Sequence, residues 1–113
     1  MSHTLDFTKR KKQYLTVTLA DEKNTVIMVG TPTKAVMDDL LILQASAETI
    51  SESGNDFEAL DELYAACARV MSRNKTGHKI TKEYLEEIFD FEDVMVFFHA
   101  YIEFVSKISS AKN

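Results

Sequence analysis

A chain of 113 residues has room for one domain and one hydrophobic core, and its make-up, 45% hydrophobic and 27% charged, is that of an ordinary globular protein. The formal net charge of -5 argues against nucleic acid as the main partner, because affinity for nucleic acid comes largely from neutralising phosphates. The single cysteine, Cys67, excludes an internal disulfide and suits a reducing compartment. There is no signal-peptide pattern and no run of the roughly 18 apolar residues that a membrane span needs, so the sequence predicts a soluble cytoplasmic protein.

The beginning of the chain is polar and irregular, and the sequence predicts a flexible N-terminal arm for residues 1–12. The arm ends in a basic run, Lys9, Arg10, Lys11 and Lys12. Such a run can be a solvated lead-in that keeps the edge of a sheet soluble, and it also fits a phosphate- or acid-binding patch. The sequence leaves both interpretations open.

A β-hairpin is predicted for residues 13–29. Leu15, Val17 and Leu19 alternate with polar or aromatic residues, which is the period of a strand with one buried face. Residues 21–24 have the length of a hairpin loop, and Asn24 tolerates the left-handed backbone that such loops often need. A two-stranded hairpin is marginally stable in water by itself, so it must pack on helices or pair with another chain.

The rest of the chain, residues 31–108, is predicted to be a helical bundle. Thr31 suits the N-cap and Pro32 the first position of a helix that runs to about residue 51. A second, amphipathic helix is expected at about 56–73. Its start carries the pattern of a capping box, with Asn55 followed three residues later by Glu58.

Two more helices complete the bundle. Thr81 caps a short helix at 82–89, and Asp90 caps a last helix that reaches about residue 108. Between the second and third helices, Gly77 is expected to supply a left-handed cap. The predicted fold is therefore α+β: a single domain over residues 1–113, in which an N-terminal β-hairpin packs on a bundle of four helices, one of them short.

The last helix carries an unusual amount of apolar surface. In the stretch 94–105, VMVFFHAYIEFV, ten of twelve residues are apolar, and on a helix they cover an arc of about 220°. A surface helix needs an apolar stripe of only about 100° or a little more. This predicts a central helix, an oligomer interface or a surface that holds a partner. The first helix also has apolar residues off its main face, and the candidate interface residues are Met37, Leu41, Ile42, Met95, Phe97, Ile102 and Phe104.

No set of residues predicts catalysis, a metal site or a cofactor site. Cys67 lies on the apolar face of the second helix, and the three histidines have no metal-ligand spacing. Residues 72–83 place Gly and Glu as a calcium loop does, but the first three ligand positions hold Ser72, Asn74 and Thr76, with no carboxylate. The basic turn around Arg73 raises a DNA-binding regulator as an alternative, which the three glutamates of the following helix oppose.

Residues 72–105 also carry a resemblance to a known family. They contain Asn-Lys-x-Gly, then Ile-Thr-Lys-Glu-Tyr-Leu, then Asp-Phe-Glu-Asp, then an aromatic helix with Phe-Phe-x-Ala-Tyr. With the preceding hairpin, the Thr-Pro helix start and two acidic amphipathic helices, nearly the whole chain resembles the tail assembly chaperones of long-tailed phages that infect Gram-positive bacteria.

The resemblance implies a non-enzymatic chaperone that self-associates as a ring or spiral and binds the tape measure protein. It would keep that protein soluble until tail tube subunits polymerise, and the tail tube protein is a further partner. The expected place is the host cell cytoplasm, not the mature virion, and the chain would match the shorter of two forms that such families make by translational frameshifting. The alternative is a small structural or connector protein of the phage particle.

Overall fold

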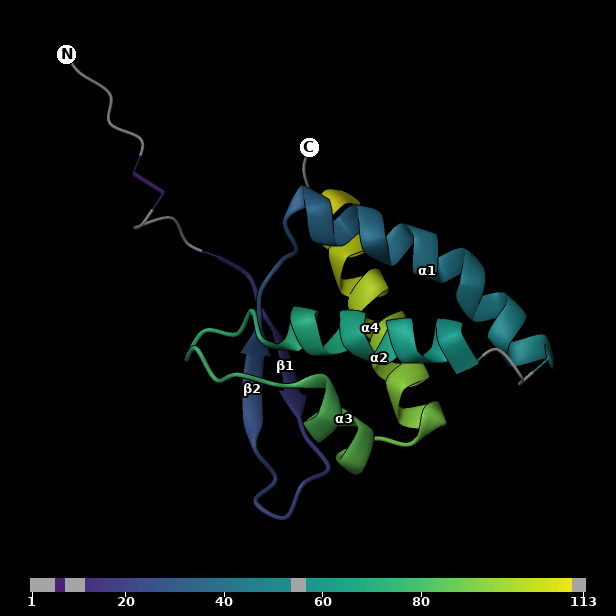
Figure 1. Cartoon of the computed structure of the whole chain (residues 1–113). Helices are drawn as coiled ribbons and strands as arrows, with labels where there is room; N and C mark the ends of the chain where they lie inside the picture. Colours follow the sequence, from purple (N-terminus) through teal and green to yellow (C-terminus); the bar gives the residue numbers. More distant parts are fainter. Residues whose placement is uncertain (1–5, 8–11, 54–56, 111–113) are drawn as a thin grey trace.

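The computed structural model describes residues 6–7, 12–53 and 57–110 (Figure 1). Two strands, β1 (Leu15–Thr18) and β2 (Val26–Val29), are followed by the helices α1 (Lys34–Ser53), α2 (Phe57–Met71), α3 (Lys82–Ile88) and α4 (Phe91–Ser110). Over the described ranges this is the predicted α+β arrangement of a hairpin with four helices, one of them short. Most of the predicted N-terminal arm lies outside the described residues.

The hairpin has the predicted buried face. The strands are antiparallel, with Leu15 opposite Val29 and Val17 opposite Ile27. Leu19, Ile27 and Val29 are buried, while Leu15 and Val17 pack against the core from its edge. Asn24 has φ +49°, the left-handed conformation expected for this loop.

The edge of β2 that does not pair with β1 is covered by the loop that follows α2. Asn74 forms a bridge with Val29, the Gly30 N–H donates to the Arg73 carbonyl (2.8 Å), and the Lys75 N–H donates to the Met28 carbonyl (2.9 Å). The Asn74 side chain also holds the loop itself, because its amide donates to the carbonyls of Met71 (2.9 Å) and His78 (2.6 Å). These bonds fix the hairpin to the end of α2.

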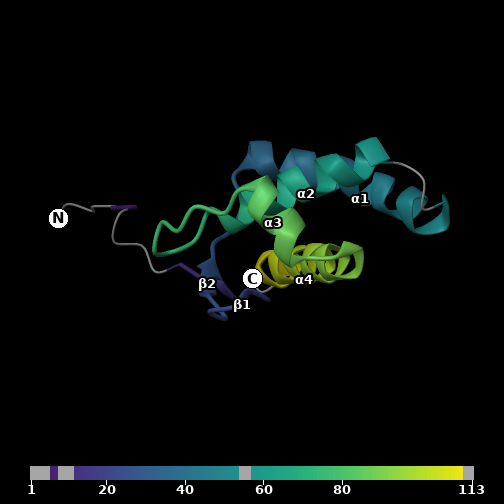
Figure 2. The same ribbon diagram turned by 60° about the horizontal axis from the view of Figure 1, so that its bottom comes forward.

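The most enclosed helix is α2. In Figure 2, α1 and α2 form one layer and the hairpin and α4 the other; α2 contacts α1, α3, α4 and β2. The small residues of α2 allow this close packing. Its buried residues are Leu63, Tyr64, Ala66, Cys67, Ala68, Val70 and Met71.

Two tyrosines attach α4, and the segment just before it, to the rest of the molecule. The Tyr101 hydroxyl donates to the Gly30 carbonyl directly after the hairpin (2.7 Å), and the Tyr64 hydroxyl donates to the Phe89 carbonyl just before α4 (2.9 Å). Burial of Tyr101 raises the pKa of its hydroxyl. Both hydroxyls therefore have partners inside the fold, as buried tyrosines require.

The helix starts are partly as predicted. Thr81 accepts a hydrogen bond from the Tyr84 N–H (3.1 Å), and Asp90 and Asp93 cap each other's backbone N–H groups, which confirms both predicted caps. The predicted capping-box residue Asn55 lies outside the described residues.

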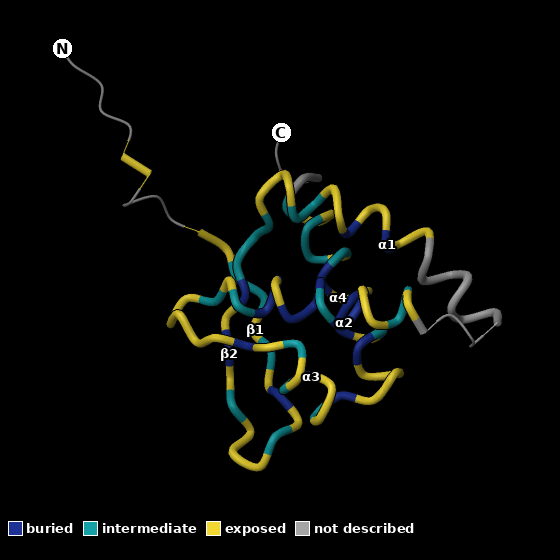
Figure 3. The backbone as a smooth tube through the Cα atoms, in the orientation of Figure 1, coloured by how far each residue is buried: buried dark blue, intermediate teal, exposed yellow. Residues whose placement is uncertain are grey.

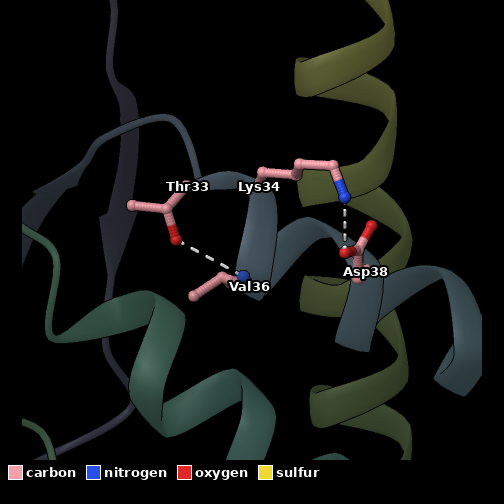
Figure 4. A network of polar contacts seen from close by, with 4 residues as sticks. All are labelled: Thr33, Lys34, Val36 and Asp38. Atoms are coloured by element: carbon pink, nitrogen blue, oxygen red, sulfur yellow. Dashed lines mark hydrogen bonds and ion pairs between the residues drawn. The ribbon is translucent and has the colours of Figure 1, made fainter.

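The predicted start of α1 was two residues early. Figure 4 shows that the capping residue is Thr33, whose hydroxyl accepts from the Val36 N–H (3.4 Å), so the helix begins at Lys34. An ion pair between Lys34 and Asp38 (2.9 Å) follows in the first turn. Thr31 instead lies in the segment that leaves the hairpin, where its carbonyl accepts from the Arg73 side chain (3.3 Å).

Gly77 has the predicted left-handed backbone but not the predicted place at the end of a helix. It has φ +76°, which favours glycine. However, α2 already ends at Met71, so Gly77 turns the loop rather than capping the helix.

Candidate partner-binding surfaces

The candidate interface residues of α1 lie at the surface. Leu41 is 51% exposed and Ile42 is 68% exposed. Leu40 and Leu43, which flank the pair in the sequence, are buried in the core. Met37 is half-buried and packs against the core. Figure 3 shows that exposed stretches dominate the part of α1 whose burial is described, interrupted by the buried Leu40 and Leu43.

The candidate residues of α4 are largely covered by the chain itself. Phe97 is buried, so its prediction as an interface residue was wrong for this fold: its ring stacks on Tyr101 at 5.8 Å and both lie in the core. Met95, Ile102 and Phe104 are half-buried and pack against the same core. The seven candidates therefore do not form one surface, and only the pair on α1 is freely exposed.

Ile42, the more exposed of the two, lines a groove between α1 and α2. This groove of about 360 Å³ is lined by Ile42 and Leu43 from α1 and by Ala65 from α2. Across it, the Arg69 guanidinium meets the Asp39 carboxylate at 3.5 Å. The groove thus combines an apolar strip with one ion pair, a pattern that can receive the apolar side of a helix.

Several exposed apolar residues were not predicted. Val96 on α4 is 69% exposed, because it lies on the polar side of the helix with Glu92 and Glu103. Its spacing from these two residues could have predicted this exposure. Val26 and Met28 face outward on β2, opposite Thr18 and Thr16. The alternation of side chains along residues 25–29 could have predicted this outward-facing side of β2.

A more polar cleft of about 790 Å³ lies between the hairpin loop and α3. At its wall, Asp21 accepts hydrogen bonds from the Tyr84 hydroxyl (2.5 Å) and from the hydroxyl (2.7 Å) and N–H (2.8 Å) of Thr25. These bonds, the one from Tyr84 above all, lower the pKa of Asp21 to about 2. The carboxylate thereby joins the hairpin to α3, and its bonds are those of a structural group.

The residues considered for chemistry occupy structural positions. Cys67 is 1% exposed, and burial raises the pKa of its thiol to about 12, so the thiolate that nucleophilic catalysis requires is strongly disfavoured. In the loop considered for calcium, the Asn74 Oδ1 accepts from the His78 N–H (2.8 Å) and the Ser72 hydroxyl oxygen accepts from the Ile80 N–H (3.0 Å). Within the described residues, no three His, Cys, Asp or Glu side chains are grouped as metal ligands.

None of the helices in the described ranges has both the length and the apolar character needed to cross a membrane. Comparison of the chain with known protein families, with curated proteins and with solved structures found no match. The surfaces above therefore have to be interpreted from their own chemistry.

Proposed function

We propose that this chain is a non-enzymatic tail assembly chaperone that self-associates and binds a long helical client, the tape measure protein. The observation that carries the proposal is the exposure of Leu41 and Ile42 on α1, with Ile42 lining the groove between α1 and α2. The resemblance of residues 72–105 to such chaperones supports the same role. The proposed location is the host cell cytoplasm, with no place in the mature virion.

The size of the groove fits a weak contact that is repeated many times. Full burial of a leucine or isoleucine side chain is worth about 1.5–3 kcal/mol, and part of this is lost to ordering the partners. Leu41 and Ile42 in one copy therefore give only modest affinity for a client helix. Copies that bind side by side along one client add their contacts through high effective concentration. Such a coat holds the client as a whole, and its subunits can still leave one at a time.

The proposal predicts that a charge on the outer side of α1 abolishes client holding. Ile42→Asp is expected to remove it, because a carboxylate in the contact would have to be desolvated. Val96→Asp is the matched control, since Val96 is 69% exposed against 68% for Ile42 but lies on α4. The measurement is co-expression with a tape measure fragment, followed by pull-down and assay of the soluble fraction.

Wild type and Val96→Asp should keep the fragment soluble, and Ile42→Asp should leave it in the pellet. Equal solubility of the fragment with and without the wild-type chain would contradict a chaperone role. Mass spectrometry of purified virions separates the alternative function: a stoichiometric amount of this chain would identify a structural or connector protein.

A further inference from the structure

Two basic segments that are far apart in the sequence meet at one pocket. Lys12, at the end of the N-terminal basic run, lines a pocket of about 280 Å³ together with Arg73 and Lys75 from the loop after α2. The Lys75 ammonium lies 5.8 Å from the centre of the Tyr14 ring, and the Arg73 Nε–H donates to the Thr31 carbonyl. These two contacts orient the cations, and we call Lys12, Arg73 and Lys75 the basic pocket.

The charges of the basic pocket have no counter-charge in the described part of the chain. The cations on the helices do: Lys34, Arg69, Lys82 and Lys107 each form an ion pair with a carboxylate. No such pair involves Lys12, Arg73 or Lys75 among the described residues. In sequence, Lys9, Arg10 and Lys11 directly precede Lys12. A concentrated positive charge on a chain of net charge -5 calls for an anionic partner.

The same chain carries the complementary charge at another place. Exposed carboxylates are concentrated on α3 and the start of α4, and we call them the acidic end: Glu83, Glu86, Glu87, Asp90, Glu92 and Asp93. Among the ion pairs of the described residues, only Glu86 of this set has a cationic partner, Lys82 at 3.6 Å. In Figures 1 and 2 alike, the α3–α4 connection lies to the right of the loop after α2, with α3 between them.

We infer that the basic pocket binds the acidic end of a second copy of this chain. The contact is head to tail, because the two charged regions are made of different residues of the chain. Contacts of this kind generate a ring or an open spiral according to the rotation between copies. This inference rests on the self-association in the proposed function and assigns it to named residues. A nucleic acid is the poorer fit, because the net charge of -5 on the chain opposes a polyanion.

The test uses the full chain without any client, and it measures the oligomeric state by sedimentation velocity at about 50 mM and about 500 mM salt. Exposed charge pairs are screened at the higher concentration, so the oligomer should dissociate there. Lys12→Glu/Lys75→Glu should weaken association about tenfold or more. The control is Lys34→Glu/Lys107→Glu, which makes the same change of charge at two exposed lysines of α1 and α4.

A charge-swap experiment distinguishes loss of the contact from misfolding of a variant. Glu87→Lys/Glu92→Lys should also fail to associate alone, but an equal mixture with Lys12→Glu/Lys75→Glu should restore the oligomer, because opposite charges meet again at every contact. Restoration by mixing also shows that both variants are folded.

Three results would overturn the inference: association that is insensitive to salt, equal loss in the control variant, or no restoration on mixing. Retarded migration of a duplex oligonucleotide that is lost only in Lys12→Glu/Lys75→Glu would assign the pocket to nucleic acid instead. Failure here leaves the client assay with Ile42→Asp unaffected, so the two proposals fail separately.

Discussion

Helices α1 and α4 have the same length, 20 residues, but they differ in which large apolar side chains the fold covers. α4 is the more aromatic of the two, yet it buries Phe97, Phe98 and Tyr101. α1 is less apolar, and it exposes Leu41 and Ile42. The difference lies in their neighbours: α4 is attached to the segment after the hairpin and packs on α2, while α1 packs mainly on α2 alone. The exposure of a side chain thus depends on what covers its side of the helix, not on the apolar content of the helix as a whole.

The comparison predicts very different costs for truncating the two helices. Phe98→Ala should lower the free energy of unfolding by about 3–5 kcal/mol, because it removes a ring from a site that is 1% exposed and leaves a cavity. Ile42→Ala should change it by less than about 0.5 kcal/mol, as is usual for a surface position. Urea unfolding followed by circular dichroism measures both. Equal effects would show that α1 is covered as fully as α4.

The attachment of α4 can be tested by removing a single hydroxyl. Tyr101→Phe should cost about 0.5–1.5 kcal/mol, because the Gly30 carbonyl loses its donor at a partly buried site. Tyr64→Phe is the matched change at the other end of α4, where the Phe89 carbonyl is the acceptor. Thermal unfolding of both variants measures the two losses. An unchanged melting temperature for Tyr101→Phe would mean that packing alone holds α4 on the hairpin side.

A smaller effect is expected from pH, and it concerns the hairpin rather than α1. The pKa of Asp21 is lowered to about 2, below the value of about 3.9 for an unfolded chain. Its contribution to stability is therefore present above about pH 4 and is lost as the pH falls towards 2. NMR titration of the Asp21 carboxyl measures the pKa directly. Tyr84→Phe should raise this pKa towards its ordinary value, and an unchanged pKa would show that the bond from Tyr84 does not hold the charge.

Local sequence patterns predicted where the strands and helices lie better than they predicted which side chains other parts of the fold cover. The alternation of Leu15, Val17 and Leu19 gave the buried face of β1, and the hydroxyl of Thr81 and the carboxylate of Asp90 marked two helix starts. These features depend on neighbours a few residues away. The burial of Phe97 depends instead on packing between distant segments, which periodicity does not report.

The candidate surfaces show the same limit. The exposure of Leu41 and Ile42 agreed with their place off the main face of α1. The basic pocket joins Lys12 to Arg73 and Lys75 only because the loop after α2 pairs with β2. In the sequence the two segments were separate basic runs with separate interpretations.

That pairing also sets an order of events during synthesis. The hairpin leaves the ribosome first, but the partner of its second edge, Asn74, emerges about fifty residues later. A lone two-stranded hairpin is marginal in water, so β2 waits for the end of α2 before its edge is closed. A nascent chain that stalls before Asn74 would expose an unpaired strand edge, the feature through which partly made proteins aggregate.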